Sequence, residues 1–219
     1  MATNKYEDFF PMVLPECPGV PGPVAINAIV TATIDFCTKS RAYRVDLDPM
    51  SISAGSADYD IEAPAQTLPV DVTKCWYIPT GELILPATED KLDEISPGWR
   101  LAQDNRPQRY LIKNRGRTIS FVPIPSESQS SVIGLKVAVR PTLAATTIDA
   151  DFFEDYMEKI APGAKSTLML MKNKQWSDEK QAAIYAAQFE AAATEARRRA
   201  AREFSRGPLT ARAQPFGGV

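Results

Sequence analysis

The sequence WSDEKQAAIYAAQFEAAATEARRRAAREF, residues 176–204, decides how this chain is built. It begins like a helix, because Ser177 can accept a free backbone amide while Asp178 and Glu179 favour the positive end of the helix dipole. No glycine or proline follows until Gly207. We therefore predict one helix, roughly 40 Å long at about 1.5 Å per residue, whose far end projects toward a partner.

This helix becomes basic toward its end, and a tail follows that is too short and too rich in glycine and proline to fold alone. The residues that we single out, called the basic end below, are Arg197, Arg198, Arg199, Arg202, Arg206, Leu209, Arg212 and Phe216. Such a segment can bind nucleic-acid phosphates, dock on an acidic protein surface, or form a solvated helix terminus. The apolar anchors in the tail favour docking, and the arginines lack the interleaved aromatic residues that stack on bases.

Two helical segments precede the final helix. The sequence from Thr147 predicts a helix with an apolar stripe and a kink or break at Pro162-Gly163, after which Ala164–Lys174 resumes. Its acidic first turn contains Asp149, Asp151, Glu154 and Asp155. These carboxylates could form a metal site, but acidic first turns are usually solvated caps, which is the interpretation that we favour.

Near the N-terminus, a connector rich in proline and glycine, residues 18–23, leads into a predicted helix from Val24 to Ser40. The apolar residues of this helix cover more than one side. We expect it to pack in the core or between subunits.

The pattern changes between Tyr43 and Arg140, where short β-branched and aromatic segments alternate with turn residues. Asn114–Arg117 and Ala54–Asp58 are the expected hairpin turns, and Thr88–Ile95 is an expected short helix. The predicted fold class is α+β: a helical bundle with an inserted small antiparallel β sandwich or barrel, a long C-terminal helix and an extended tail. The expected domains are residues 1–42 with 141–204 (helical), 43–140 (β) and 205–219 (tail).

Composition excludes much of enzyme chemistry. The 219 residues include no histidine, and Cys17, Cys37 and Cys75 are too far apart for a zinc motif or a dense disulfide framework. The carboxylates Glu89, Asp90, Asp93 and Glu94 are expected to form a solvated face, because no partner acid, base or phosphate loop accompanies them. We predict reduced thiols, no catalytic residue, no metal and no cofactor. No apolar run is long enough to cross a bilayer, so no membrane partner is expected.

Several stretches together resemble the tailed-phage head-to-tail adaptor proteins, the connector subunits between portal ring and tail. They are Tyr6–Pro11, Pro15–Gly19, Ala25–Ile29, Phe36-Cys37, Ala54–Ile61, Val139–Pro141, Phe152–Tyr156, Trp176–Asp178, Tyr185 and Phe189. The pattern departs from that of the family at Ala161-Pro162-Gly163, where an unbroken helix would be expected.

The resemblance implies a non-enzymatic virion protein, assembled in the host cytoplasm, that forms a homo-oligomeric ring of about twelve copies through head-to-tail contacts. It implies that the C-terminal segment docks on the portal protein ring and that the β insert faces the tail or nozzle protein. Genomic DNA would pass through the channel during ejection. On this basis we assign all eight residues of the basic end to portal docking, with nucleic-acid binding through the same arginines as the competing hypothesis.

Overall fold

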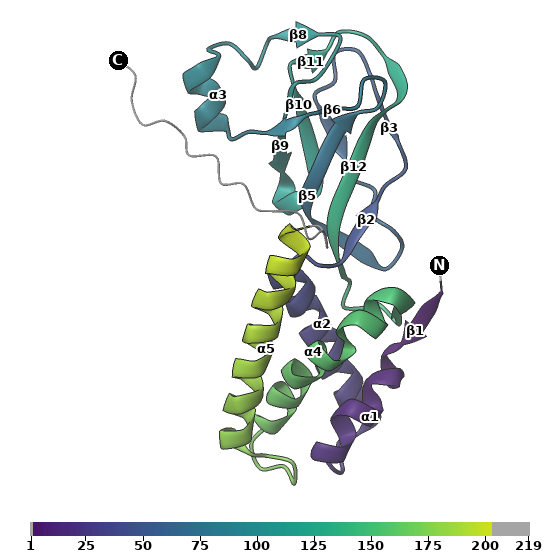
Figure 1. The fold of residues 1–219 in the computed structure, drawn as a ribbon, viewed down its shortest axis with the longest axis vertical. Helices are drawn as coiled ribbons and strands as arrows, with labels where there is room; N and C mark the ends of the chain where they lie inside the picture. The colour runs from purple at the N-terminus through teal and green to yellow at the C-terminus, as the bar shows by residue number, and fades with distance from the viewer. Residues whose placement is uncertain (1, 203–219) are drawn as a thin grey trace.

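The computed structural model describes residues 2–202. The molecule is elongated: α2, α4 and α5 pack against one another at one end, and the sheets form the other (Figure 1). The fold class is α+β, as the sequence predicts.

Helices and strands are bounded as follows. The helices are α1 (Phe10–Val13), α2 (Gly22–Ser40), α3 (Glu89–Ile95), α4 (Ala150–Met169) and α5 (Glu179–Ala201), with 3-10 turns η1 (Tyr6–Phe9), η2 (Leu14–Glu16) and η3 (Asn114–Gly116). The strands are β1 (Thr3–Lys5), β2 (Arg44–Asp46), β3 (Met50–Ile52), β4 (Asp58–Asp60), β5 (Thr67–Tyr77), β6 (Glu82–Leu83), β7 (Leu85–Pro86), β8 (Gln103–Asp104), β9 (Arg109–Lys113), β10 (Thr118–Val122), β11 (Ile124–Pro125), β12 (Gln129–Pro141) and β13 (Thr147–Asp149).

The predicted N-terminal helix is confirmed as α2, which packs against both α4 and α5. Its fully buried Phe36 lies at the centre of an aromatic cluster, 5.3 Å from the Tyr156 ring of α4 and 6.1 Å from the Phe189 ring of α5. Aromatic pairs at such distances contribute beyond their buried area. This cluster fixes the positions of the three helices relative to one another.

Of the kink or break predicted at Pro162-Gly163, the break is wrong, because α4 continues through both residues to Met169. A proline within a helix removes one backbone hydrogen bond, so tertiary packing must compensate. Gly163 supplies part of that packing: a Cβ added there would lie 2.7 Å from the Phe189 ring. The missing side chain lets α5 approach α4 closely, which stabilises the unbroken helix.

The C-terminal helix is confirmed, but its start and its far end differ from the prediction. Asp178 is the cap, since its carboxylate accepts the amides of Lys180 and Gln181 at 3.0 Å, whereas Ser177 binds the preceding turn. Ala196 and Ala200 are fully buried, so the helix packs along its neighbours through its last turn rather than projecting beyond them.

The strands form two larger sheets that enclose a second apolar core. One sheet has the order β4-β10-β9-β7, and the other has the order β2-β12-β5-β6 with β3 also paired to β12. Fully buried Ile119 and Phe121 of β10 face the same core as Leu135 and Val137 of β12. Strand alternation thus places one face of each sheet in the shared core.

The expected hairpin at Asn114–Arg117 is confirmed, because β9 and β10 pair antiparallel around it. The turn at Ala54–Asp58 is not a hairpin, since β3 pairs with β12 and β4 pairs with β10. It carries the chain from one sheet to the other. Glu82–Leu85 behaves similarly, because Ile84 separates β6 and β7, which lie in different sheets.

Candidate docking surface

Four of the eight residues of the basic end lie in the described part of the chain. Arg197, Arg198, Arg199 and Arg202 are all exposed around the C-terminal end of α5. The other predicted residues, Arg206, Leu209, Arg212 and Phe216, lie outside the described residues.

The helix that carries these arginines is held firmly by its opposite face. Buried Ala193, Ala196 and Ala200 face the other helices, and small side chains allow helices to approach closely. Glu195 also lies 3.7 Å from Lys159 of α4. The arginine side chains therefore extend from a fixed backbone into solvent.

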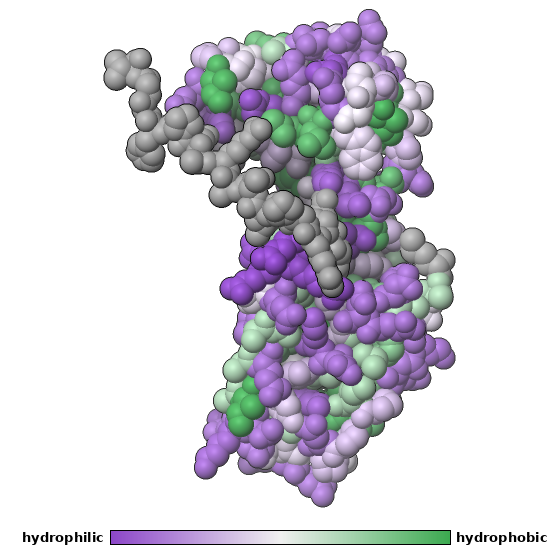
Figure 2. Space-filling view, in the orientation of Figure 1, coloured by the Kyte–Doolittle hydropathy of each residue, from purple (hydrophilic) through white to green (hydrophobic). Residues whose placement is uncertain are grey.

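The end of α5 forms the most hydrophilic region near the junction of helices and sheets (Figure 2). Arginine is favourable there because the C-terminal end of a helix dipole is negative. Arg199 lies near buried Tyr156, where the guanidinium partly offsets the rise in the pKa of the phenol that burial causes. Arg197 and Arg198 form no hydrogen bond or ion pair through their side chains with the other described residues.

A planar guanidinium with several donors fits carboxylates and phosphates in two-point contacts. The geometry therefore suits an anionic partner that approaches the end of α5. It does not by itself distinguish an acidic protein surface from a nucleic acid, which leaves both sequence hypotheses in place.

In the acidic segment at the start of α4, one carboxylate forms a capping hydrogen bond. Asp149 accepts the Phe152 amide at 3.0 Å, which confirms the cap interpretation for this residue. Asp151 is exposed on the first turn of α4, and Glu154 and Asp155 are exposed on the turn after it. Within residues 2–202, no group of three or more metal-ligating side chains comes together.

Part of the second predicted acidic face, at α3, has a structural role. Asp93 accepts the Trp99 indole N–H at 2.8 Å and forms an ion pair with Arg100. These contacts, with Arg100 as the largest cause, lower the pKa of Asp93 below its ordinary value. Glu89 lies 3.7 Å from the same guanidinium. The ion pairs of Asp93 and Glu89 with Arg100 hold the loop after α3 against the helix.

The three cysteines are free, as predicted, and all three are fully buried. Burial raises the pKa of each thiol, to about 12 for Cys75. Because the thiolate is the nucleophile, these residues are unsuited to covalent chemistry at neutral pH.

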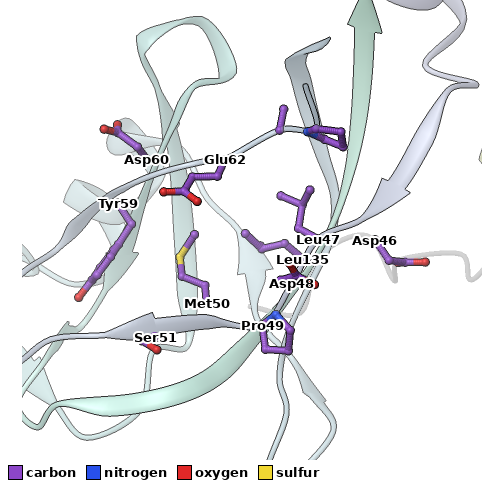
Figure 3. A pocket seen from close by; sticks show the side chains of 12 residues that line it. Asp46, Leu47, Asp48, Pro49, Met50, Ser51, Tyr59, Asp60, Glu62 and Leu135 are labelled. Atoms are coloured by element: carbon purple, nitrogen blue, oxygen red, sulfur yellow. The ribbon is translucent and has the colours of Figure 1, made fainter. Parts of the chain in front are cut away.

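Sequence reasoning missed an acidic groove of about 750 Å³ at the edge of the sheets. Its carboxylates come from two separate segments and are Asp46, Asp48, Asp60 and Glu62. Glu62 and Met50 face the same space, whereas Asp46 points away at the rim (Figure 3). Predicting this groove from the sequence would require knowing how the segments around β2, β3 and β4 pack together.

One protein family matches most of this chain. A family model described as SU10 adaptor protein matches residues 13–212. A search of curated proteins gave no match. Among the described residues, no helix combines the length and apolar character needed to span a bilayer.

Proposed function

Because this chain belongs to the SU10 adaptor protein family, a family of phage head-to-tail adaptors, we propose that its specific role is to join the portal ring to the tail. The family match, which spans residues 13–212, is the observation that carries this proposal. The family is structural and its members are virion components, so the chain is a structural phage protein.

In the proposed assembly, identical copies form a ring beneath the portal, about twelve by analogy with the adaptors that the sequence resembles. Identical subunits in a ring need two different complementary surfaces, so that each copy contacts the next head to tail. Genomic DNA would pass through the central channel, and the tail or nozzle protein would bind the side away from the portal.

The portal contact is assigned to the basic end. Its support is that Arg197 and Arg198 are exposed on a helix whose other face is buried against α2 and α4. Preorganised arginines lose less conformational entropy on binding than arginines on a loose segment. The remaining assigned residues, Arg206, Leu209, Arg212 and Phe216, would extend this contact along the portal.

We further propose that the chain is organised as a helical bundle, residues 1–42 with 141–204, into which residues 43–140 are inserted as a β sandwich or barrel, with residues 205–219 as a tail. The buried apolar clusters among the described residues support this division, because one lies within residues 6–42 and 145–200 and the other two lie within residues 52–139. Residues 24–40 would then pack the bundle, with exposed positions left for contacts between subunits.

Nucleic-acid binding is the second candidate, since the exposed guanidinium groups fit phosphates as well as carboxylates. Residues 197–202 contain no aromatic side chain that could stack on a base. Titration of the isolated chain with duplex DNA at increasing salt separates the two, because phosphate binding weakens steeply as ions are added.

The direct test is to mix the purified chain with the portal ring of the same phage and measure the mass of the product. The proposal expects a complex with several copies of this chain per portal ring. A product with the mass of the portal ring alone would contradict the proposal, at concentrations where related adaptor and portal proteins assemble.

A further inference from the structure

The acidic groove has no role in the portal contact proposed above. It lies at an open seam between the two sheets, where β4 is the last strand of one sheet and β2 the last strand of the other. Open strand edges accept extended segments through backbone hydrogen bonds. The groove therefore has the architecture of a site for an extended chain.

The walls and floor of the groove define the chemistry of that chain. Asp48, Asp60 and Glu62 are exposed along it, and fully buried Leu135 forms part of its floor beside half-buried Met50. Thr118 donates a hydrogen bond to Asp60, at 3.2 Å. Asp48 and Glu62 have no ion-pair partner among the described residues. An occupant should combine basic side chains with apolar anchors.

This chain carries such a segment itself. Residues 203–219 contain Arg206 and Arg212 with Leu209 between them, and they follow directly on the arginines of α5. Fully extended, these residues reach at most about 60 Å, which is long enough to pass to a neighbouring molecule. In Figure 1, α5 runs along the left of the helical end, whereas β2 and β3 run along the right of the sheet end.

We propose that, in the free protein, the acidic groove of one copy binds the C-terminal segment of a second copy. The contact is head to tail, because the groove and the segment are different surfaces. One part of this proposal rests on the proposed adaptor function. The same C-terminal residues cannot bind the groove and the portal at once, so the portal competes with the groove for them. Self-association of free copies is then reversible and sensitive to salt.

The test uses the full chain in sedimentation velocity over a range of concentrations at low and high salt. The wild type should associate with rising concentration at low salt and dissociate at high salt. The variant Asp48→Lys/Glu62→Lys should lose association at least tenfold, and Arg206→Glu/Arg212→Glu should lose it similarly. Mixing the two variants should restore it, because the unchanged segment of the groove variant meets the unchanged groove of the segment variant, and the two reversed surfaces are also complementary.

The matched control is Glu94→Lys/Glu127→Lys, which changes charge equally at two exposed carboxylates away from the groove and should associate like the wild type. Far-UV circular dichroism shows whether each variant is folded. A wild type that stays monomeric at low salt would overturn the proposal, as would groove variants that associate normally or a mixture that does not recover.

Portal binding by the same variants keeps the two proposals apart. Asp48→Lys/Glu62→Lys leaves the basic end intact and should still bind portal rings. If the wild type does not self-associate but does bind the portal, the groove proposal alone is wrong. If the wild type self-associates through the groove but never binds a portal, the adaptor role is what fails.

Discussion

Asp178 fixes where α5 begins, because its carboxylate satisfies two of the amides that every helix start leaves without a partner. Replacing Asp178 with Ala should lower the free energy of unfolding by about 1 kcal/mol, measured by urea denaturation. Asp178→Asn is the matched control and should retain most of the stability, since asparagine caps about as well. An equal loss in both variants would show that the charge, not the cap, stabilises this end.

The sequence could predict a cap here but not which residue provides it. Serine and aspartate are both strong N-cap residues, and Ser177 and Asp178 are adjacent. The local sequence therefore does not determine at which of the two the first turn begins. Ser177 instead accepts the Lys174 amide at 3.0 Å in the loop before the helix. Packing of that loop, which sequence patterns do not report, selects Asp178.

The buried thiols give a prediction about reactivity and pH. At pH 8 the native protein should react slowly with a thiol reagent, and full reaction should require denaturant, because burial raises the pKa of all three cysteines. Above about 8.5, the ordinary thiol pKa, the unfolded chain loses protons that the native state keeps. The free energy of unfolding should therefore fall as pH rises from there toward 12. Rapid labelling of Cys75 in the native protein would contradict the burial described here.

Contacts between elements explain why α4 is unbroken. Proline and glycine side by side are typical of a helix end, and that local rule fails because Phe189 packs directly over Gly163. The contact joins residues of two different helices, so no local pattern reveals it. The sequence is expected to depart here from the unbroken helix of the family that it resembles, and the structure shows that α4 is unbroken as well.

Gly163→Ala tests this contact. Alanine favours a helix by about 1 kcal/mol over glycine, but a Cβ 2.7 Å from the Phe189 ring forces the helices apart, which typically costs about 1–3 kcal/mol. We expect net destabilisation in thermal unfolding. Combining it with Phe189→Leu should give a smaller loss than the sum of the single losses, because the smaller side chain relieves the clash. Strict additivity would contradict a direct contact.

On the scale of the whole molecule, the α+β class, the positions of α2, α3 and α5 and the β9–β10 hairpin follow from local periodicity and turn chemistry. The acidic groove does not, because Asp48 and Glu62 belong to segments whose meeting depends on strand order in two sheets. The split of Glu82–Leu85 between sheets has the same cause. Local patterns predict which residues alternate along a strand, but they do not predict which strand pairs with it.

Removal of residues 203–219 is predicted to weaken portal binding, because it deletes Arg206, Leu209, Arg212 and Phe216, while α5 and its buried alanines are retained. Ending the chain at Glu195 is less informative, because it also removes buried Ala196 and Ala200. Portal affinity and thermal unfolding, measured together on the chain that ends at Arg202, separate the two effects. A large fall in melting temperature for that variant would show that the tail stabilises the fold.

The portal affinity of Arg197→Glu/Arg198→Glu tests the central claim most directly. Both side chains are exposed, so the reversal should leave far-UV circular dichroism nearly unchanged. Lys172→Glu/Lys174→Glu, at the loop before the opposite end of α5, is the control with the same change in charge. If the basic end docks on the portal, the arginine variant loses at least tenfold in affinity and the lysine variant binds like the wild type. Equal binding by both folded variants would contradict the assignment.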